Sequence, residues 1–378
     1  MKYYIIAGEA SGDLHGSNLI KELRRLDGNA SIRCWGGDKM EAAGATLIKH
    51  YRDLAFMGFT EVVKNLPTIF RNIAFCKKDI QEFTPDVLIL IDYPGFNLRI
   101  AKWAKEQGLK IIYYISPQVW AWKENRVKSI IRDVDKMLVI LPFEKEFYKK
   151  WNFEVEYVGH PLVEVIEEFQ NNEQGAKNKE QGIDQVELTG GNVIALLPGS
   201  RQQEILIKLP IMLEVAKRFP AYKFIVAKAP GLPASFYDGL LKPYQNVGAV
   251  VNRTYELLNH AKAALVTSGT ATLETALFAV PEIICYKGGN ISYQIAKRLI
   301  KIKFIGLVNL IMNKEVVKEL IQNDLTVDNI STELHKLLED PNRKQQLKKD
   351  YAELRELLGK GGHASANAAK SIYSFIKD

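Results

Sequence analysis

Short apolar runs alternate with amphipathic stretches along the first half of the chain. In the stretches between the runs, apolar residues recur every three or four positions, which is the spacing of a helix with one buried face. The segment 17–26 is an example, with apolar residues at 19, 20, 23 and 26. The runs predict strands at 3–7, 32–35, 87–92, 110–115, 137–141 and 155–158. Strands that alternate with helices predict a parallel sheet covered on both faces.

A second alternating series follows a polar segment. Residues 167–192 hold few large apolar side chains, so we predict an exposed connection between two domains there. The later runs predict strands at 193–197, 223–227, 249–251, 263–266 and 283–286. From about residue 328 the pattern is helical, with a break at Gly361-Gly362. We therefore expect two Rossmann-like α/β domains at 1–166 and 193–361, and a C-terminal helix over about 362–378 that packs back on the first domain.

Composition limits the class of protein. The 378 residues suffice for two domains, and 47% hydrophobic with 25% charged residues is typical of a soluble globular protein. Three widely spaced cysteines argue against a disulfide framework or a zinc site, and they fit a reducing, cytoplasmic location. The chain enters a strand directly after Met1, so we expect no signal peptide, and no apolar run reaches 18 residues.

The net charge of +7 indicates an acidic partner, such as anionic lipid or a phosphorylated substrate. The sequence has no zinc finger, RNA-binding motif or basic block, so we do not expect a nucleic-acid partner. Two apolar stretches with interleaved cations are candidates for contact with an anionic membrane surface. The first comprises Phe59, Val62, Val63, Leu66, Ile69, Phe70 and Ile73, and the second Ile295, Leu299, Ile300, Ile302 and Phe304. A core-facing stripe is the alternative, and we favour the membrane for the first stretch only.

A glycine-rich stretch, Gly8-Glu-Ala-Ser-Gly-Asp-Leu-His-Gly16, joins the first predicted strand to the first predicted helix. In open α/β sheets, ligands bind at such turns, where glycines let a ligand approach the backbone and helix N-termini offer free N–H groups. The candidate substrate-binding residues are Gly8, Glu9, Ser11, Gly12 and Asp13. A tight turn with an Asp cap is the alternative. The glycine spacing differs from the dinucleotide-binding pattern G-x-G-x-x-G.

Two further strand ends of the first domain carry candidate chemistry. Asp92 ends an apolar run before Tyr93-Pro-Gly-Phe-Asn97, which predicts a general base at the ligand edge of the sheet or, alternatively, a turn or helix cap. The stretch 114–122 is rich in aromatic residues. Ser116, Gln118 and Trp120 are candidates to line the bottom of a sugar or lipid pocket. A packed core corner is the alternative there.

Two small-residue turns follow strands of the second domain. Pro198, Gly199 and Ser200 precede Arg201, and backbone N–H groups with a guanidinium suit a diphosphate. Ser268, Gly269 and Thr270 form a second candidate anion nest, and the Glu274 carboxylate can accept hydrogen bonds from a ribose diol. The alternative for Arg201 is an ordinary surface side chain after a turn. The alternative for Glu274 is an acidic residue that is favourable near the start of a helix.

Motifs of several other chemistries are absent from the sequence. It contains no H-E-x-x-H, Walker A or G-x-S-x-G pattern. Its single D-x-D, at Asp133 and Asp135, precedes a predicted strand, so we interpret it as a solvated turn at the wrong end of the sheet for a ligand. We therefore expect Arg and helix dipoles, rather than a metal or cofactor, to neutralise a bound diphosphate.

Taken together, these motifs resemble the lipid-A-disaccharide synthases, B-type glycosyltransferases of bacterial outer-membrane biosynthesis. The resemblance covers nearly the whole chain. It rests on Gly8–Asp13, Met57-Gly-Phe-Thr-Glu-Val62, Ile91–Asn97, Ser116–Trp122, Leu141-Pro-Phe-Glu-Lys145, Gly159-His160, Pro198–Arg201 and Ser268–Glu274. It implies two Rossmann-like domains facing a cleft, the GT-B arrangement, and an enzyme that is peripheral on the inner membrane.

The resemblance also implies an activity. The donor would be UDP-2,3-diacylglucosamine and the acceptor 2,3-diacylglucosamine 1-phosphate, giving a β-1,6-linked disaccharide 1-phosphate and UDP without a metal. Asp92 and Arg201 would be the catalytic residues. Many relatives have a second Asp where this chain has Gly95, which weakens a two-carboxylate mechanism here. A UDP-N-acetylglucosamine 2-epimerase, another UDP-sugar GT-B enzyme and a non-catalytic nucleotide-sugar-binding protein are the alternatives, and the sequence leaves open whether the chain forms a homodimer.

Overall fold

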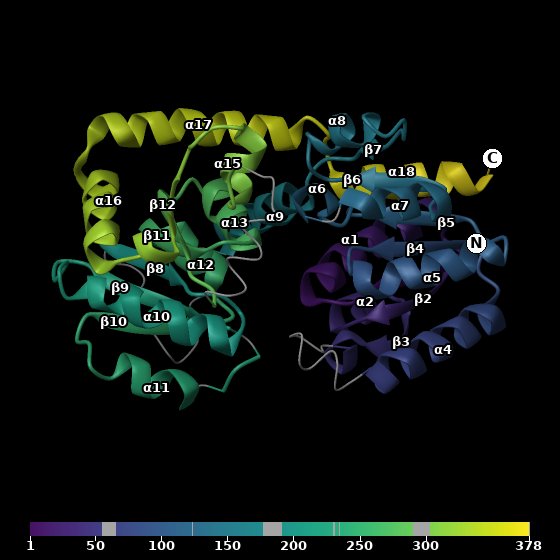
Figure 1. Ribbon diagram of the computed structural model, residues 1–378, viewed down its shortest axis with the longest axis horizontal. Helices are drawn as coiled ribbons and strands as arrows, with labels where there is room; N and C mark the ends of the chain where they lie inside the picture. Colours follow the sequence, from purple (N-terminus) through teal and green to yellow (C-terminus); the bar gives the residue numbers. More distant parts are fainter. Residues whose placement is uncertain are drawn as a thin grey trace. The chain divides into compact units, whose positions relative to one another are not determined.

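Two parallel β-sheets organise the chain, one in each of its two units (Figure 1). The computed structural model describes residues 1–54, 66–122, 124–176, 191–229, 231–233, 235–289 and 303–377. Unit 1 comprises Met1–Pro161 and Leu358–Asp378, and unit 2 comprises Leu162–Leu357. The predicted class, α/β with two Rossmann-like domains, is confirmed.

Among the described residues, the sheet of unit 1 has seven parallel strands in the order β3-β2-β1-β4-β5-β6-β7. They are β1 (Lys2–Ala7), β2 (Ser31–Gly36), β3 (Thr46–His50), β4 (Val87–Ile91), β5 (Ile111–Tyr114), β6 (Lys136–Val139) and β7 (Glu156–Tyr157). The helices are α1 (Ala10–Leu26), α2 (Asp38–Ala42), α4 (Leu66–Phe83), α5 (Pro94–Glu106), α6 (Val119–Trp122), α7 (Val127–Asp133), α8 (Glu144–Lys149) and α18 (Ala364–Lys377), with 3₁₀ turns at Tyr51–Leu54 and Glu124–Arg126. Every residue of β4 is buried, as expected of a strand covered on both faces.

Strand order fixes where a ligand can bind in unit 1. The chain runs outward from β1 in one direction and from β4 in the other, so these two neighbours form the topological switch point. Ala7 of β1 pairs with Ile91 of β4, and both are the last residues of their strands. Gly8 and Asp92, the next residues of each strand, therefore lie side by side at the edge where open α/β sheets bind ligands.

The described part of unit 2 repeats this plan with six parallel strands in the order β10-β9-β8-β11-β12-β13. They are β8 (Val193–Leu197), β9 (Lys223–Lys228), β10 (Val247–Val251), β11 (Ala261–Thr267), β12 (Glu282–Tyr286) and β13 (Lys318–Ile321). The helices are α9 (Pro161–Ala176), α10 (Gln202–Ala216), α11 (Ser235–Leu241), α12 (Thr254–His260), α13 (Thr270–Leu277), α15 (Leu307–Met312), α16 (Val327–Glu339) and α17 (Pro341–Gly359), with a 3₁₀ turn at Gln322–Asp324. The switch point lies between β8 and β11, where Leu197 pairs with Val266.

The C-terminal helix α18 packs against α1, which confirms that the chain returns to the first domain (Figure 1). The Asn367 side-chain amide donates to the Val158 carbonyl at 3.1 Å, and Ser371 Oγ donates to Glu156 Oε2 at 2.6 Å. A Cβ on Gly361 would lie 2.3 Å from the Gly159 nitrogen, so this close backbone approach requires glycine.

Two local predictions differ from the structure. The predicted strands omit β3 and β13, which are edge strands with mostly half-exposed residues and therefore lack a clear apolar run. Helix α9 continues through Ala176, so the first part of the segment predicted as a connection is helical, while 177–190 lie outside the described residues.

In the described part of the chain, Cys34, Cys76 and Cys285 are free and buried, and no helix has the length and apolarity to cross a membrane.

Candidate active site

Asp92 lies at the carboxyl end of β4 in an unusual backbone conformation. Asp92 has φ of +42° and Tyr93 has φ of +49°, and both values are in the left-handed region that non-glycine residues rarely adopt. Two side chains hold this turn through the Asp92 carbonyl, which accepts hydrogen bonds from Asn97 Nδ2 at 2.8 Å and from the Tyr113 hydroxyl. Strained turns of this kind persist where surrounding contacts fix them, and they are common at functional sites.

The Asp92 carboxyl group has the acidity of a general base that works at neutral pH. Desolvation by burial, helped by the nearby Glu9 carboxylate, raises the pKa of Asp92 to about 7, while the Tyr93 backbone N–H opposes the shift. Gly8 brings Glu9 to this place, because a Cβ on Gly8 would lie 2.3 Å from the Tyr93 ring. The structure thus places Gly8, Glu9 and Asp92 at one edge of the sheet.

The glycine-rich stretch is helical rather than a loop, which corrects the predicted helix start at residue 17. Helix α1 begins at Ala10, so the connecting turn is only Gly8-Glu9. Gly12 is buried, and a Cβ there would lie 3.0 Å from the Ala7 Cβ, so its small size serves packing of α1 on β1. Ser11 is exposed in the first turn of the helix.

Asp13 has a structural role, and its substrate contact stays a prediction. Its carboxylate is 3% exposed and accepts backbone hydrogen bonds from Gly37 at 2.8 Å, Met40 at 3.0 Å and Lys39 at 3.2 Å. These are the free N–H groups at the start of α2. The alternative of an Asp cap is therefore correct in kind, but the cap serves α2 across the fold rather than its own helix.

We predict that Asp13→Ala destabilises unit 1 by about 2 kcal/mol, because buried backbone donors at the start of α2 lose their acceptor. Urea unfolding of the variant measures this loss, with exposed Ser11→Ala on the same helix as a control expected to change stability little. Unchanged stability together with weaker substrate binding would restore the substrate-contact role of Asp13.

The aromatic stretch after β5 forms a buried polar network. Ser116 is 5% exposed, and its hydroxyl lies 2.7 Å from that of Tyr148. Glu144 accepts from Trp120 Nε1 at 3.2 Å and from the Leu141 N–H at 3.0 Å, and desolvation raises its pKa to about 7. Ser116 thus has a packing role, and its substrate contact stays a prediction. Gln118 is exposed and Trp120 half-buried at this strand end, so these two stay candidates.

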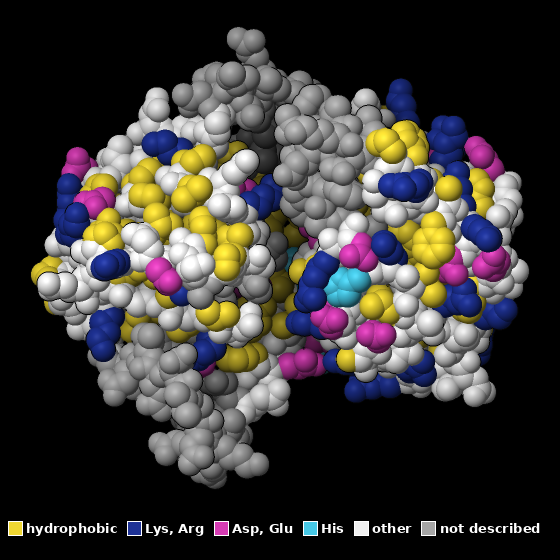
Figure 2. Space-filling model, turned by 90° about the horizontal axis from the view of Figure 1, so that it is seen from below, with side chains coloured by type: hydrophobic (Ala, Val, Ile, Leu, Met, Phe, Trp, Pro, Cys, Tyr) yellow, Lys and Arg dark blue, Asp and Glu magenta, His cyan; other side chains and the backbone are white. Residues whose placement is uncertain are grey.

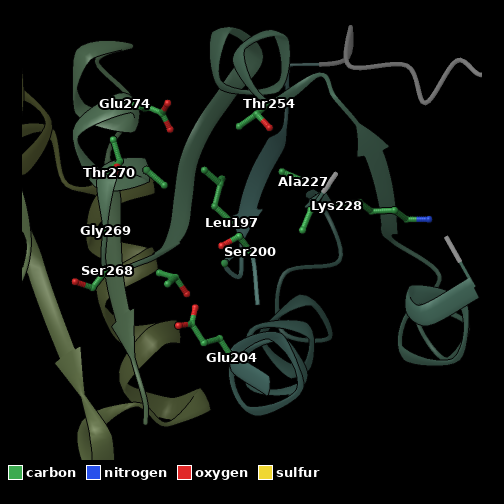
Figure 3. A pocket seen from close by; sticks show the side chains of 14 residues that line it. Leu197, Ser200, Glu204, Ala227, Lys228, Thr254, Ser268, Gly269, Thr270 and Glu274 are labelled. Atoms are coloured by element: carbon green, nitrogen blue, oxygen red, sulfur yellow. The ribbon is translucent and has the colours of Figure 1, made fainter. Parts of the chain in front are cut away.

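A pocket of about 310 Å³ lies at the switch point of unit 2 (Figure 3). It opens where β8 and β11 end, and both predicted small-residue turns line it. Its lining includes Gly199, Ser200, Glu204, Lys228, Thr254, Ser268, Gly269, Thr270 and Glu274. Gly199 has φ of +112° and Gly269 has φ of +144°, which other residues rarely adopt. The two turns that the sequence analysis identified, at 198–201 and 268–270, therefore meet at one pocket.

Glu274 lies in the pocket wall on α13 and accepts a hydrogen bond from the Tyr255 hydroxyl at 2.8 Å. Desolvation by burial raises the pKa of Glu274, and the Tyr255 bond opposes this shift. Tyr255 is itself held in an aromatic cluster with Phe169 and Phe278. The carboxylate is thus fixed in one orientation, with capacity left to accept further hydrogen bonds.

Arg201 does not line the pocket in this structure. Its side chain is 60% exposed, and its guanidinium lies 3.6 Å from Glu204 Oε1, a residue that does line the pocket. Pro198 is also outside the lining, and its carbonyl accepts a hydrogen bond from Thr267 Oγ1 at 3.0 Å that ties the two turns together. Arg201 is therefore beside the pocket with a side chain free to reorient.

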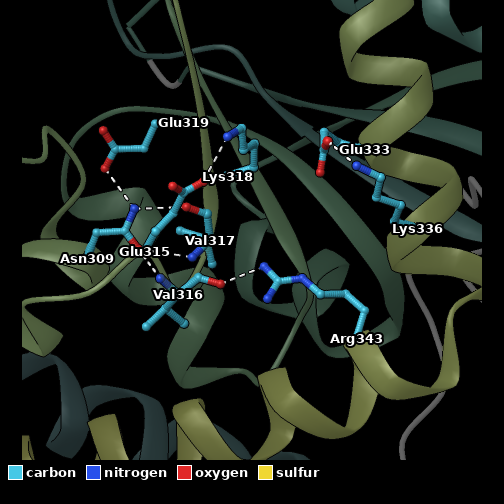
Figure 4. A network of polar contacts seen from close by, with 9 residues as sticks. All are labelled: Asn309, Glu315, Val316, Val317, Lys318, Glu319, Glu333, Lys336 and Arg343. Atoms are coloured by element: carbon cyan, nitrogen blue, oxygen red, sulfur yellow. Dashed lines mark hydrogen bonds and ion pairs between the residues drawn. The ribbon is translucent and has the colours of Figure 1, made fainter.

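Polar residues that the sequence analysis did not identify support the Ser268 turn, and Figure 4 shows the contacts of Asn309 with Glu319, Val316 and Val317. Ser268 Oγ donates to the Ile305 carbonyl at 3.1 Å, and Glu319 accepts from the N–H groups of Ile305 and Gly306, both at 3.0 Å. Asn309 donates to Glu319 at 2.9 Å and is bonded on its other side to Val316 and Val317. No motif marks these residues, because their partners are mostly backbone groups.

The acidic pair Asp133 and Asp135 lies at the amino ends of the strands, as predicted, but it is not simply solvated. Asp133 is 4% exposed and paired with Arg132 at 2.6 Å, and Asp135 accepts from the Ile111 N–H at 2.8 Å. Gly95 is exposed, and a Cβ there would meet nothing within 4 Å, so the position has room for a side chain. Among the described residues, no three His, Cys, Asp or Glu side chains cluster as metal ligands.

The two parallel sheets, one in each unit and each with a switch point, define a two-domain Rossmann-like α/β fold of the GT-B type. Solved structures of this class align over nearly the whole chain. A UDP-GlcNAc 2-epimerase from Neisseria meningitidis bound to UDP-GlcNAc has a TM-score of 0.65 with 14% identity and covers 100% of both chains. The glycotransferase of kitacinnamycin has a TM-score of 0.66 with 14% identity, covering 99% of this chain and 98% of its own. At these identities the likeness shows the fold alone.

Sequence relatives define the family. Residues 3–373 match the family model described as lipid-A-disaccharide synthetase. A lipid-A-disaccharide synthase of Geobacter metallireducens is 40% identical over 363 residues, which are 95% of this chain and 93% of the relative. One from Coxiella burnetii is 36% identical over 376 residues, which are 98% of both chains. The chain belongs to the lipid-A-disaccharide synthetase family, and it is a glycosyltransferase of lipid A biosynthesis.

Proposed function

We propose that the protein transfers 2,3-diacylglucosamine from UDP to 2,3-diacylglucosamine 1-phosphate, with inversion at the anomeric carbon. The observation that carries this proposal is Asp92, a partly buried carboxyl group at the switch point with a pKa raised to about 7. A base of this pKa is ionised in a substantial fraction of molecules at neutral pH and still accepts a proton readily. Family membership supplies the class of donor and acceptor.

In the proposed reaction, Asp92 takes the proton of the acceptor hydroxyl group. The oxygen of that hydroxyl group attacks the anomeric carbon of the donor at the same time. The bond between that carbon and the UDP oxygen breaks on the opposite face, so the new glycosidic bond is β. UDP leaves with the bonding electron pair, and its added negative charge needs stabilisation at the diphosphate. The Asp92 proton then passes to solvent. One base and one anion-stabilising site complete the chemistry.

We assign the UDP moiety to the unit 2 pocket. The turns at Gly199-Ser200 and Ser268–Thr270 offer backbone N–H groups to the diphosphate, Arg201 adds a cation beside them, and Glu274 accepts from the ribose hydroxyls. Because Ser268 already donates to Ile305, its contribution is through the backbone rather than the hydroxyl. The pocket lining thus has donors for a diphosphate and an acceptor for a diol.

An assay of UDP release tests the proposal and separates it from the epimerase alternative. Release should require both acyl-sugar substrates, because the proposed base acts on the acceptor hydroxyl. We expect full activity in EDTA, since Arg and backbone N–H groups take the place of a cation at the diphosphate. Strict dependence on magnesium would contradict this account, and turnover of UDP-N-acetylglucosamine without an acceptor would favour the epimerase.

We further propose that unit 1 contacts an anionic membrane surface through α4, because diacylated substrates must reach the enzyme from a bilayer. The predicted apolar stripe is divided: Ile69 and Ile73 pack into the core, whereas Phe70 is 58% exposed. Phe75, which the prediction did not include, is 48% exposed on the same helix. Figure 2 shows hydrophobic side chains among Lys and Arg on the unit 1 side of this view. The Arg99 guanidinium lies 5.9 Å from the centre of the Phe70 ring. Other members of the two predicted stretches, at 59–63 and 295–302, lie outside the described residues.

Replacing Phe70 and Phe75 together with Ser should lower binding to anionic vesicles by roughly tenfold, because two exposed aromatic rings no longer enter the interface. Added salt should lower the binding of the parent protein too, since cations contribute. Co-sedimentation with vesicles measures both effects. Leu26→Ser, which removes an apolar side chain 43% exposed on α1, is the control. If the double variant bound vesicles as well as the parent protein does, α4 would not be part of the membrane contact.

A further inference from the structure

Glu204 is an acidic side chain in a pocket that we assign to a diphosphate. It is on the first turn of α10 and lines the pocket, and Figure 3 shows its carboxylate pointing into the space. The Gly199 turn lies against it, because a Cβ on Gly199 would be 2.9 Å from Glu204 Oε2. A carboxylate in this position repels phosphate oxygens, so its presence calls for an explanation beyond anion binding.

The first part of the explanation is Lys208, one turn further along α10. Its side chain is 2% exposed, and its ammonium lies 3.6 Å from Glu204 Oε2. A buried cation is costly unless it is paired. Desolvation lowers the pKa of Lys208 and Glu204 opposes that shift, in keeping with a pair in which the carboxylate keeps the ammonium charged. Lys208 has no freedom to leave, because the core surrounds it.

The second part is Arg201, which approaches the other oxygen of the same carboxylate. Its guanidinium is 3.6 Å from Glu204 Oε1, and its side chain is 60% exposed. An exposed ion pair of this kind is weak, because water screens it and competes for both partners. Glu204 thus lies between a fixed, buried cation and a mobile, exposed one.

We propose that Glu204 is a positioning residue that holds Arg201 in the ligand-free protein and releases it to the diphosphate when a nucleoside diphosphate binds. Lys208 keeps the carboxylate neutralised after Arg201 has left it. This inference rests on the proposed function of the pocket. Its consequence is that Glu204 competes with the ligand for Arg201, which lowers the affinity for UDP and speeds the release of UDP as a product.

The two neighbours of Arg201 should therefore change UDP affinity in opposite directions. Glu204→Gln removes the competitor and one repulsive charge, so we expect UDP to bind roughly tenfold more tightly. Lys208→Met leaves the carboxylate without its buried partner, so it should hold Arg201 more strongly and weaken UDP binding by roughly tenfold. Calorimetry with UDP on the full-length protein measures both, and thermal melting checks that each variant is folded.

Two comparisons separate this role from a structural one. Glu214→Gln makes the same charge change near the other end of α10, where Glu214 pairs with Lys217 at 2.8 Å, and it should leave UDP affinity unchanged. In an Arg201→Ala background, Glu204→Gln should keep only the part of its effect that comes from the lost repulsion between the carboxylate and the diphosphate, because the residue it releases is gone. An undiminished effect would overturn the inference.

The outcomes distinguish the inference from the proposed function. If the parent protein fails to bind UDP, the assignment of the pocket fails, and the inference with it. If the parent binds UDP but folded Glu204→Gln binds it equally or more weakly, only the inference is overturned. Glu204→Ala replaces Glu204→Gln if the latter does not fold, and failure of both to fold would give Glu204 a purely structural role and overturn the inference.

Discussion

Asp92→Asn lowers turnover by roughly 10²–10⁴-fold while the protein stays folded. The amide keeps the shape of the carboxylate but cannot take the proton from the hydroxyl group of the acceptor sugar. The turn around it should persist, since Asn97 and Tyr113 bind the Asp92 backbone carbonyl rather than its side chain. Steady-state assays with both acyl-sugar substrates measure the loss. KM should change much less than kcat, because the missing interaction forms with the moving proton.

The pH profile gives this prediction a second readout. The base must be ionised, and burial raises the pKa of Asp92 to about 7 from an ordinary value of 3.8. Activity should therefore fall as the pH decreases through about 7, rather than through about 4, and it should approach a tenfold loss per pH unit below that point. Asp92→Asn should remove this acidic limb.

Glu9→Gln is the matched control for Asp92→Asn. Glu9 is exposed at the same edge, and its charge contributes to the raised pKa of Asp92, so its loss should shift the acidic limb to lower pH without removing it. Near-normal turnover of folded Asp92→Asn would contradict the assignment of Asp92 as the general base. Attention would then turn to Glu9 or to His15, whose pKa is lowered to about 4 by burial and by the nearby Lys39, so that its imidazole is neutral at pH 7.

Arg201→Ala should reduce activity by roughly 10²–10³-fold, because the departing UDP loses a cation that stabilises its developing charge. UDP should also bind more weakly, as calorimetry would measure. Arg201→Lys should recover only part of the loss, since an ammonium cannot bind a diphosphate through two parallel N–H donors. Arg218→Ala, which removes another partly exposed arginine of unit 2 that pairs with Asp328, is the control and should leave activity near the parent value.

Glu274→Ala completes this test of the pocket. Its loss should weaken UDP binding, because the ribose diol loses an acceptor that Tyr255 holds in place. If UDP affinity were unchanged in both Arg201→Ala and Glu274→Ala, the UDP site would have to lie elsewhere in the molecule.

The sequence predicted the elements whose signal is local. Buried central strands such as β4 and β8 are continuous apolar runs, and the residues that follow them, Asp92 and Pro198–Arg201, could be placed at the ligand edge because parallel strands share one direction. The edge strands β3 and β13 gave no such signal, since they are half-exposed and mix polar with apolar residues.

Residues whose partners are distant in sequence were harder to interpret. Asp13 resembled a ligand contact because nothing near it in sequence reveals that residues 37–40 supply its hydrogen-bond donors. The buried contact of Ser116 was likewise not visible in the sequence, since its partner Tyr148 lies on α8, far along the chain. Glu204 carried no motif of its own, and only the fold shows that it lies in the pocket between Arg201 and Lys208.

Mass analysis of the lipid product tests the central claim most directly. The purified protein is incubated with UDP-2,3-diacylglucosamine and 2,3-diacylglucosamine 1-phosphate, and the lipids and nucleotides are extracted. The account predicts a disaccharide 1-phosphate that carries the acyl chains of both substrates, with one UDP released per disaccharide. Unchanged acceptor together with an isomerised or hydrolysed donor would contradict it.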